Sequence, residues 1–384
     1  MKISLAVVLG LGFSVAVILS TIGIMDGFVS TLKSGLQRTN GDMTLTFRRG
    51  FFQFDQSMQD KFLNAGITEI AEVVQTESFL IKQSDNESER EAKGVLARGV
   101  DTKVFGRVVG MDLKVAENEI VIGSQLAQLL NLKIGDEVVL TMAKGNSEVQ
   151  SLPQLISRKI GRIVNHGVYQ KDLRIVYFNK DDLQQLIDVG TKVNQLVFNI
   201  PGSHSNTDYI LSYLPLLKNQ FSEEYMFKPF WKEFGSLIEA VHVEKILIGL
   251  VLQVVVIISI FNILAFIMYV NEKRARDFFL VSALGLPRTE LAKVWYLAVF
   301  ALWLTGCLLS ILFVQVFKFL ILKLSIINLP PEIYFLGAFD IQVGFLEYLF
   351  VFGVAFLWIY LMSWFVIRKI KKRSLLEGLR QEFS

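Results

Sequence analysis

The sequence predicts an α-helical membrane protein with four transmembrane helices and a large mixed α+β extracytoplasmic domain inserted between helices 1 and 2. Apolar residues make up 52% of the 384 residues, and 31 residues are Phe. The mean hydropathy of +0.45 also exceeds that of a typical soluble fold. Four apolar runs are near or above the roughly 20 residues that a spanning helix needs. They are residues 3–25, 246–270, 294–317 and 345–366.

The positions of the basic residues predict the orientation, because Lys and Arg in short loops mark the cytoplasmic side of a membrane. One group lies between the second and third spans and another follows the fourth, whereas residues 325–344 contain neither Lys nor Arg. The two groups are Lys273, Arg274, Arg276, Arg288 and Lys293, and Arg368, Lys369, Lys371, Lys372 and Arg373. We therefore divide the chain into a first span with its exit (1–27), an extracytoplasmic domain (28–240), and spans 2 to 4 with a basic tail (241–384).

The first apolar run has a second interpretation, as a signal peptide with Lys2 as its charged start. The run is longer than the usual apolar region of roughly 7 to 15 residues and has no clear small-residue cleavage site, which favours a span. Gly23 and Gly27 at its end form a pair that would allow close helix approach, although such pairs also arise by chance. The single cysteine, Cys307, lies in the third span, so the extracytoplasmic domain contains no disulfide.

Short runs with strand-like composition alternate with helix-like segments in the extracytoplasmic domain. Helices are expected near 124–130 and from Asp181 onward, and residues 228–244 have apolar residues at helical spacing before the second span. The predicted strands are 42–47, 69–79, 93–100, 119–122, 137–142, 159–164, 174–178 and 195–200.

The loop between the second and third spans reads as a short cytoplasmic helix over about residues 272–286. Phe278, Val281 and Leu284 are about one turn apart, and Gly285 and Pro287 would end this helix and begin the next. One interpretation is an interfacial helix that dips into lipid. The other is a knob that enters a cleft on a separate ATPase, with Arg274 and Arg276 orienting it. The pattern alone does not separate them.

No motif predicts catalysis by this chain. There is no G-x-x-x-x-G-K-[ST] phosphate loop, so we expect no nucleotide of its own, and no other cofactor. His166, His204 and His242 are too scattered to indicate a metal site. The basic clusters adjoin membrane spans and have no aromatic stacking platform, which argues against nucleic-acid binding. We therefore expect that the chain is not itself an enzyme.

Several stretches, in order, resemble the LolC/LolE family of permease subunits of lipoprotein-releasing ABC transporters, within the wider MacB/FtsX-like group. Residues 22–45 are similar to the segment where the first span leaves the membrane, and the blocks 94–101, 117–140 and 160–187 resemble the family's domain signature. Residues 261–291 resemble the end of the second span and the coupling helix. The family usually has an amphipathic helix before the first span, whereas this sequence starts at Met1-Lys2-Ile3.

This resemblance implies a role in the bacterial inner membrane, where two such permeases, as copies or paralogues, work with two ATPase subunits that bind ATP and Mg²⁺. The cargo would be lipoproteins, passed from membrane lipid to a periplasmic carrier. Three sets of residues follow as expected sites. The ATPase-coupling set is Arg274, Arg276, Phe278, Val281, Leu284 and Gly285. The lipid-cleft set is Leu19, Ile22, Met25, Phe28, Ile248, Val251, Leu252 and Val255. The carrier loop, 147–157, has apolar tips at Leu152, Pro153 and Leu155.

Two alternatives remain within the same wider group. A MacB-like mechanotransmission permease would move no substrate through the bilayer and would instead drive an outer-domain pump. An FtsX-like subunit would regulate a cell-wall hydrolase. The large outer domain and its signature blocks favour lipoprotein release.

Overall fold

The computed structural model describes residues 2–82, 92–143, 154–203, 205–274, 277, 280–281, 284–285, 287–323 and 341–372. The chain divides into two compact units. Unit 1 comprises Met1–Val29, Ser236–Asn328 and Phe339–Ser384, and unit 2 comprises Ser30–Gly235 and Leu329–Ala338.

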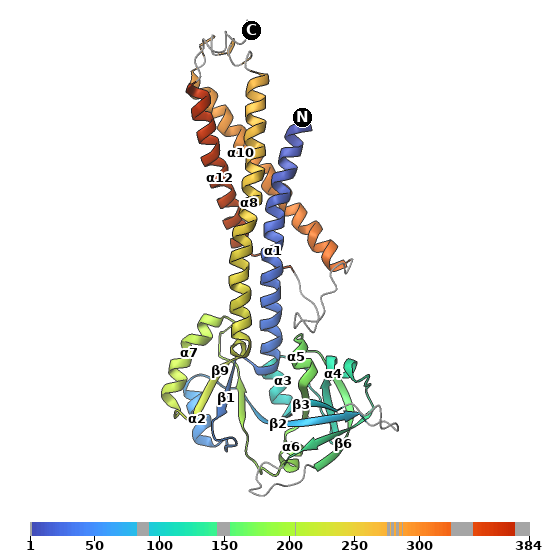
Figure 1. Cartoon of the computed structure of the whole chain (residues 1–384). Coiled ribbons are helices and arrows are strands. Elements are labelled where there is room, and N and C mark those ends of the chain that lie inside the picture. Colours follow the sequence, from blue (N-terminus) through green and yellow to red (C-terminus); the bar gives the residue numbers. More distant parts are fainter. Residues whose placement is uncertain are drawn as a thin grey trace. The chain divides into compact units, whose positions relative to one another are not determined.

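Unit 1 is helical (Figure 1). By length and composition, 4 of the helices that the structure describes suit a membrane span, which confirms the predicted number. They belong to α1 (Lys2–Asn40), α8 (Gly235–Lys273), α10 (Arg288–Lys323) and α12 (Phe345–Lys372). Each predicted apolar run lies within one of these helices. α1 continues beyond the predicted end of the first span, and the division between the units falls inside it.

The core of unit 1 is built from large aliphatic side chains of all four helices, including Leu11, Leu19, Ile263 and Ile359. Gly306 permits close packing of α10 against α1, because a Cβ there would lie only 2.7 Å from Leu11 Cδ2. Gly23 plays a different part from the predicted helix–helix contact. Its carbonyl accepts a 3.0 Å hydrogen bond from the Gln342 amide. A side chain at Gly23 would collide with Ile341 and Val343, so the glycine makes room for residues 341–343.

Unit 2 is a mixed α+β structure around one 9-stranded sheet with the order β3-β7-β4-β6-β5-β2-β8-β1-β9. An additional pairing of β3 with β2 closes six of the strands into a ring, and β8, β1 and β9 extend from it. The pairs β3–β7 and β4–β6 are parallel, and the other pairs are antiparallel. The strands are β1 (Met43–Phe47), β2 (Ile70–Lys82), β3 (Ala92–Val100), β4 (Glu119–Gly123), β5 (Glu137–Met142), β6 (Gln154–Val164), β7 (Ile175–Asn179), β8 (Gln195–Phe198) and β9 (Tyr225–Pro229).

Short helices cap and cover this sheet. Side-chain caps begin several of them: Asp55 accepts from the Met58 amide, and Asp101 accepts from the amides of Lys103 and Val104. The helices are α2 (Gln56–Asn64), α3 (Thr102–Val109), α4 (Ser124–Leu129), α5 (Tyr169–Arg174), α6 (Lys180–Leu186) and α7 (Thr207–Gln220).

All eight predicted strands are confirmed within a few residues at their ends, and the predicted helices near 124 and 181 are α4 and α6. The expectation of a helix over 228–244 is wrong at its start. Residues Tyr225–Pro229 form β9, a 3-10 helix η2 follows at Phe230–Phe234, and α8 begins only at Gly235. Pairing with β1, in which Leu45 faces Phe227, overrides the helical pattern.

Candidate functional site

Two polar contacts join α1 and α8 within unit 1. Lys245 Nζ lies 2.7 Å from both carboxylate oxygens of Asp26, and both side chains are partly exposed. At another point along α1 and α8, Ser14 Oγ and Ser259 Oγ are 2.6 Å apart and buried. A polar side chain in an apolar bundle is stabilised by such a partner on the neighbouring helix. These contacts therefore fix the two helices that carry the predicted lipid-cleft residues.

The predicted lipid-cleft set does not form one exposed surface. Leu19 is 0% exposed, inside the core of unit 1. Val251 and Val255, by contrast, are 67% and 39% exposed. The remaining members, which are Ile22, Met25, Phe28, Ile248 and Leu252, are half-buried. We correct the set by removing Leu19, because a side chain enclosed by its own bundle has no free surface for an acyl chain.

A longer apolar stripe on α8 surrounds Val251 and Val255. Its members recur three or four residues apart, as expected for one helix face. They are Leu247, Leu250, Val251, Val254, Val255, Ile258 and Phe261, and all are exposed in unit 1. Contiguous exposed apolar surface on this scale marks contact with lipid or with another apolar chain. Hydropathy alone did not single out this face, because α8 is apolar all round.

A cavity of about 440 Å³ lies between α1 and α8 near the N-terminal part of α1. It is mainly apolar, with Ser259, Asn262 and Tyr269 as polar members. Its other lining residues are Ala6, Val7, Gly10, Leu11, Ala265 and Phe266. The sequence analysis did not identify this cavity, because its lining depends on how the two helices pack.

The coupling set lies in the partly described stretch between α8 and α10. Gly285 has a φ of +100°, and the Leu284 amide donates to the Leu280 carbonyl at 3.0 Å, which confirms a helix stop at the glycine. Val281 is exposed, and Leu284 is 88% exposed. Arg274 Nη1 is 3.9 Å from Asp277 Oδ2. Arg276 and Phe278 lie outside the described residues.

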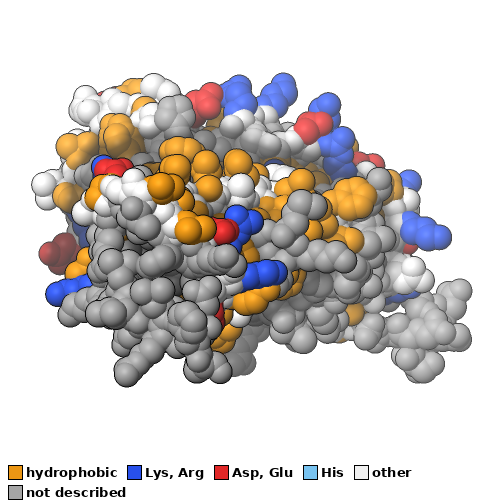
Figure 2. Space-filling model, turned by 90° about the horizontal axis from the view of Figure 1, so that it is seen from above, with side chains coloured by type: hydrophobic (Ala, Val, Ile, Leu, Met, Phe, Trp, Pro, Cys, Tyr) orange, Lys and Arg blue, Asp and Glu red, His pale blue; other side chains and the backbone are white. Residues whose placement is uncertain are grey.

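Seen from above, hydrophobic side chains reach the surface in several places, and Lys and Arg side chains lie both among them and toward the margins of the view (Figure 2). A single exposed apolar side chain such as Leu284 is not unusual by itself. The exposed side chain of Leu284 is compatible with either of the two interpretations of the coupling segment.

Of the predicted carrier-loop tips, Leu152 and Pro153 lie outside the described residues. Leu155 is not in a loop. It belongs to β6, where it pairs with Thr141 of β5, and its side chain is 70% exposed. The strand starts at Gln154, earlier than the predicted residue 159, because the antiparallel pairing with β5 continues to Met142.

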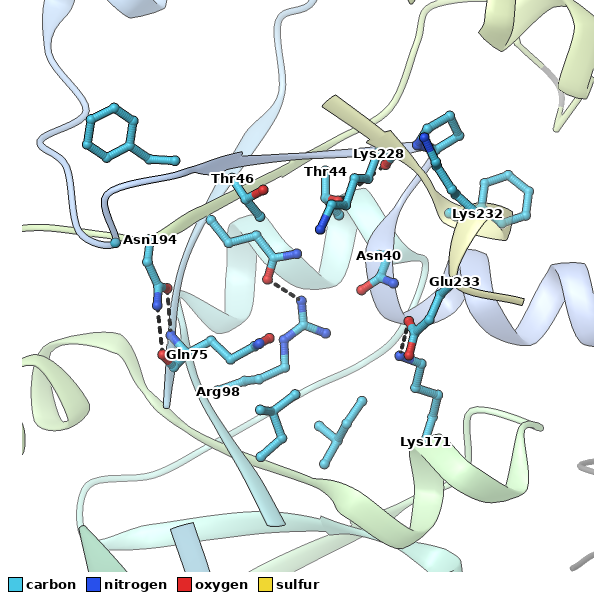
Figure 3. A pocket seen from close by; sticks show the side chains of 17 residues that line it. Asn40, Thr44, Thr46, Gln75, Arg98, Lys171, Asn194, Lys228, Lys232 and Glu233 are labelled. Carbon is cyan, nitrogen blue, oxygen red and sulfur yellow. Dashed lines mark hydrogen bonds and ion pairs between the residues drawn. The ribbon is translucent and has the colours of Figure 1, made fainter. Parts of the chain in front are cut away.

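Unit 2 contains a polar cavity of about 580 Å³ that the sequence analysis did not predict (Figure 3). Its charged members come from four elements: Arg98 from β3, Lys171 from α5, Lys228 from β9, and Lys232 and Glu233 from η2. We call it the Arg98 pocket. Neutral polar members are Asn40, Thr44, Thr46, Gln75, Asn194 and Gln195. No sequence motif links these residues, because they are up to about two hundred positions apart.

Arg98 is the most buried charged residue of this pocket, with a side chain held from two directions. Its Nη1 donates to the Thr39 carbonyl at 2.8 Å and its Nη2 to Gln195 Oε1 at 3.3 Å. Burial lowers the pKa of Arg98, while attraction to Tyr177 and Glu233 opposes this effect. Burial likewise lowers the pKa of Lys171, whose Nζ lies 2.5 Å from Glu233 Oε2.

Behind Arg98 runs a buried chain of side chains. Tyr177 hydrogen-bonds His166 Nε2 at 2.7 Å, and His166 Nδ1 is 2.6 Å from Asp172 Oδ1. Burial raises the pKa of Tyr177 to about 12, so its phenol stays protonated at neutral pH. An Asp, a His and a hydroxyl group in a row resemble a catalytic triad in composition. His166 is fully enclosed, however, so no substrate reaches it. Within the described residues, no group of three or more His, Cys, Asp and Glu side chains could hold a metal ion.

Two family models match the chain. Residues 4–156 match the MacB-like periplasmic core domain, and residues 249–375 match the FtsX-like permease C-terminal region. The lipoprotein-releasing system transmembrane protein LolC of Xylella fastidiosa strain 9a5c is 19% identical over 99% of this chain and 94% of its own length. The chain is a homologue of the LolC proteins.

Other LolC proteins agree. LolC of Xylella fastidiosa strain Temecula1 is 19% identical over 89% of this chain and 85% of its own length. LolC of Neisseria meningitidis serogroup B is 22% identical over 76% of this chain and 71% of its own length. The resemblance to the LolC/LolE family, within the MacB/FtsX-like group, is therefore confirmed. Together with the four helices that are long and apolar enough to span a membrane, it supports a multi-pass membrane protein with an FtsX-like permease region.

Two solved structures are similar at lower levels. The periplasmic region of MacB from Actinobacillus actinomycetemcomitans is 12% identical, with a TM-score of 0.32, and the match covers 52% of this chain and 95% of that one. The extracellular domain of the noncanonic ABC-type transporter YknZ from Gram-positive bacteria is 12% identical, with a TM-score of 0.29, over 48% of this chain and 98% of that one.

Proposed function

We propose that this LolC homologue is the permease subunit of an ABC transporter that extracts lipoproteins from the outer leaflet of the inner membrane and passes them to a periplasmic carrier. The observation that carries this proposal is the similarity along 99% of the chain to a protein named as part of a lipoprotein-releasing system. The exposed apolar face of α8 is consistent with it.

The physical chemistry of the cargo demands a sheltered path. At about 0.8 kcal/mol per CH₂, about 45 methylenes on three acyl chains would cost on the order of 35 kcal/mol to transfer into water. Acyl chains must therefore pass from the bilayer to an apolar surface and from there directly to a carrier. The stripe around Val251 and Val255 on α8 supplies apolar surface of this kind.

The topology belongs to the same proposal. Residues 28–240 form the extracytoplasmic domain between the first and second spans, and the basic segments near 271–293 and 368–373 lie in the cytoplasm. Lys and Arg in such short segments favour this orientation. Leu284 then faces the compartment that contains nucleotide, where an exposed apolar side chain can pack into an ATPase.

The partners follow from this arrangement. Two ATPase subunits bind ATP and Mg²⁺, and a second permease, either a copy or a paralogue, completes the apolar cleft. A soluble periplasmic carrier accepts the lipoprotein. In this proposal the chain itself binds neither nucleotide nor nucleic acid. Its role is to transmit the closure of the ATPase subunits to the apolar cleft between the permeases.

Depletion of the protein followed by fractionation of inner and outer membranes tests the proposal. We expect lipoproteins destined for the outer membrane to accumulate in the inner membrane, and re-expression to reverse this. Unchanged lipoprotein distribution would contradict the proposal. If septation or wall-hydrolase activity failed instead, the FtsX-like alternative would be favoured, and loss of efflux alone would favour the MacB-like one.

A further inference from the structure

The Arg98 pocket carries an excess of positive charge. Of its five charged members, four are cationic and only Glu233 is anionic. Glu233 pairs with Lys171, and among the described residues the ammonium groups of Lys228 and Lys232 have no ion-pair partner. The four cations face one carboxylate in the pocket, Glu233, and a second one, Asp172, lies behind Tyr177. With both carboxylates counted, two positive charges remain uncompensated. Unpaired cations lining one cavity attract an anion.

The guanidinium of Arg98 also has an unused donor. Arg98 is 2% exposed, and its Nε has no hydrogen-bond partner although it is buried. Buried polar atoms of native proteins are nearly always satisfied, so an orphaned donor requires an explanation. Acceptor oxygens bound in the cavity would add to the acceptors that the guanidinium already has in Thr39, Gln195 and Tyr177.

The close view shows how the donors converge. The Arg98 guanidinium lies in the middle of the pocket, with Gln75 and Asn40 on either side and Lys228 above it (Figure 3). The side-chain amides of Asn40 and Gln75 make no hydrogen bond to other described residues, so their N–H groups are also free to donate. The volume of about 580 Å³ is larger than a single phosphate group needs.

A purely structural role explains only part of this arrangement. Arg98 donates to the Thr39 carbonyl in the last turn of α1, where a cation is favourable at a helix C-terminus. This contact and the contact of Nη2 with Gln195 Oε1 each use one donor of the guanidinium. They explain neither the orphaned Nε nor the gathering of Lys228 and Lys232, which come from separate elements at the same cavity.

From this geometry we propose that the Arg98 pocket of unit 2 binds a phosphate group, either of a phospholipid headgroup or of a soluble phosphate ester. A guanidinium fork matches the oxygens of phosphate or carboxylate. The excess of positive charge is balanced more fully by a phosphate monoester, which carries up to two negative charges, than by a carboxylate or a phosphodiester, each of which carries one. Arg98 is the central donor, and Lys228 and Lys232 are the electrostatic clamp at the mouth, where both are exposed.

The test uses the full chain, purified in a zwitterionic detergent and in nanodiscs. Its probes are inorganic phosphate, glycerol 3-phosphate, and nanodiscs of phosphatidylglycerol compared with nanodiscs of a phosphate-free glycolipid. Calorimetry and thermal stability report binding of the soluble probes, and thermal stability reports the lipid effect. The variants are Lys228→Gln, Lys232→Gln and the double variant. The matched control is Lys218→Gln, an exposed lysine on α7 outside the pocket.

We expect the double variant to bind the probe about tenfold more weakly than the wild type, with Lys218→Gln unchanged, and we expect binding to weaken in high salt. Binding of glycerol 3-phosphate in detergent assigns a soluble ester as the source. A response only to phosphatidylglycerol nanodiscs assigns a lipid headgroup. Absence of binding by the wild type to every probe, or equal loss in Lys218→Gln, would overturn the proposal.

Arg98→Lys is a further variant, but loss of its contact with Thr39 can unfold unit 2, so the lysine variants carry the test. None of these measurements involves lipoprotein release. A failure of the phosphate site is therefore distinguishable from a failure of the proposed transport function.

Discussion

Lys245 of α8 and Asp26 of α1 form a two-pronged ion pair within unit 1, with Nζ 2.7 Å from each carboxylate oxygen. The pair is partly exposed, so solvent screens it and its contribution is modest. Its location matters more than its energy, because it ties together the two helices that bear the proposed lipid-contacting residues.

Neutralising either partner should loosen this helix pair. We expect Asp26→Asn or Lys245→Gln to lower the free energy of unfolding by about 1 kcal/mol, and to slow lipoprotein release. The exchanged double variant Asp26→Lys with Lys245→Asp should restore most of both. Thermal unfolding in detergent and membrane fractionation measure the two effects. The exposed pair of Lys293 and Glu290 on α10 is the control, and equal effects there would refute a special role for Asp26 and Lys245.

Site-specific photo-crosslinking should separate the lipid-facing from the buried side of α8. A photoreactive residue at Val251 or Val255, which are exposed, should capture lipoprotein or phospholipid. The neighbouring Val256 is 1% exposed, so the same residue there should capture little of either. Equal capture at Leu19 and at Val251 would show that the bundle opens and that our removal of Leu19 from the set is wrong.

Leu284→Asp should weaken attachment of the ATPase. A charge placed on this exposed apolar side chain removes the group that would fill a cleft on the partner, and desolvating it would cost several kcal/mol. Co-purification of the ATPase measures the effect. Ile134→Asp, a matched change on an exposed side chain of unit 2, should leave co-purification normal. Full recovery of the ATPase with Leu284→Asp would favour the interfacial-helix interpretation.

Asp42 should be essential to the stability of unit 2. Its buried carboxylate accepts hydrogen bonds from Gln37 Nε2 at 2.7 Å, from the Ile200 amide at 2.9 Å and from Ser203 Oγ at 2.5 Å. Asp42→Ala leaves these donors unpaired and should cost about 3 kcal/mol. Proteolysis of the full chain in increasing urea measures the loss. Glu223→Ala, an exposed change, should leave the urea profile unaltered, and a similar profile for Asp42→Ala would contradict the assignment.

Much of the architecture follows from local sequence. The four spanning helices were predictable because each needs only a long apolar run. The strand positions were also predictable from alternating β-branched and apolar residues. β9 was missed because its residues, Tyr225–Pro229, are few, contain a proline and lead into a helical spacing of aromatics. Only its pairing with β1 makes it a strand, and that partner is far away in the sequence.

The sequence by itself determined the number of spans, the helix stop at Gly285 and the resemblance to LolC, because these depend on local composition and spacing. Tertiary structure decided which apolar residues are buried and which are free: Leu19 and Val251 have the same hydropathic character but opposite environments. It also closed the ring through the β2–β3 pairing and gathered Arg98, Lys171, Lys228 and Lys232 around one cavity. Such arrangements depend on contacts between distant segments, which no local pattern encodes.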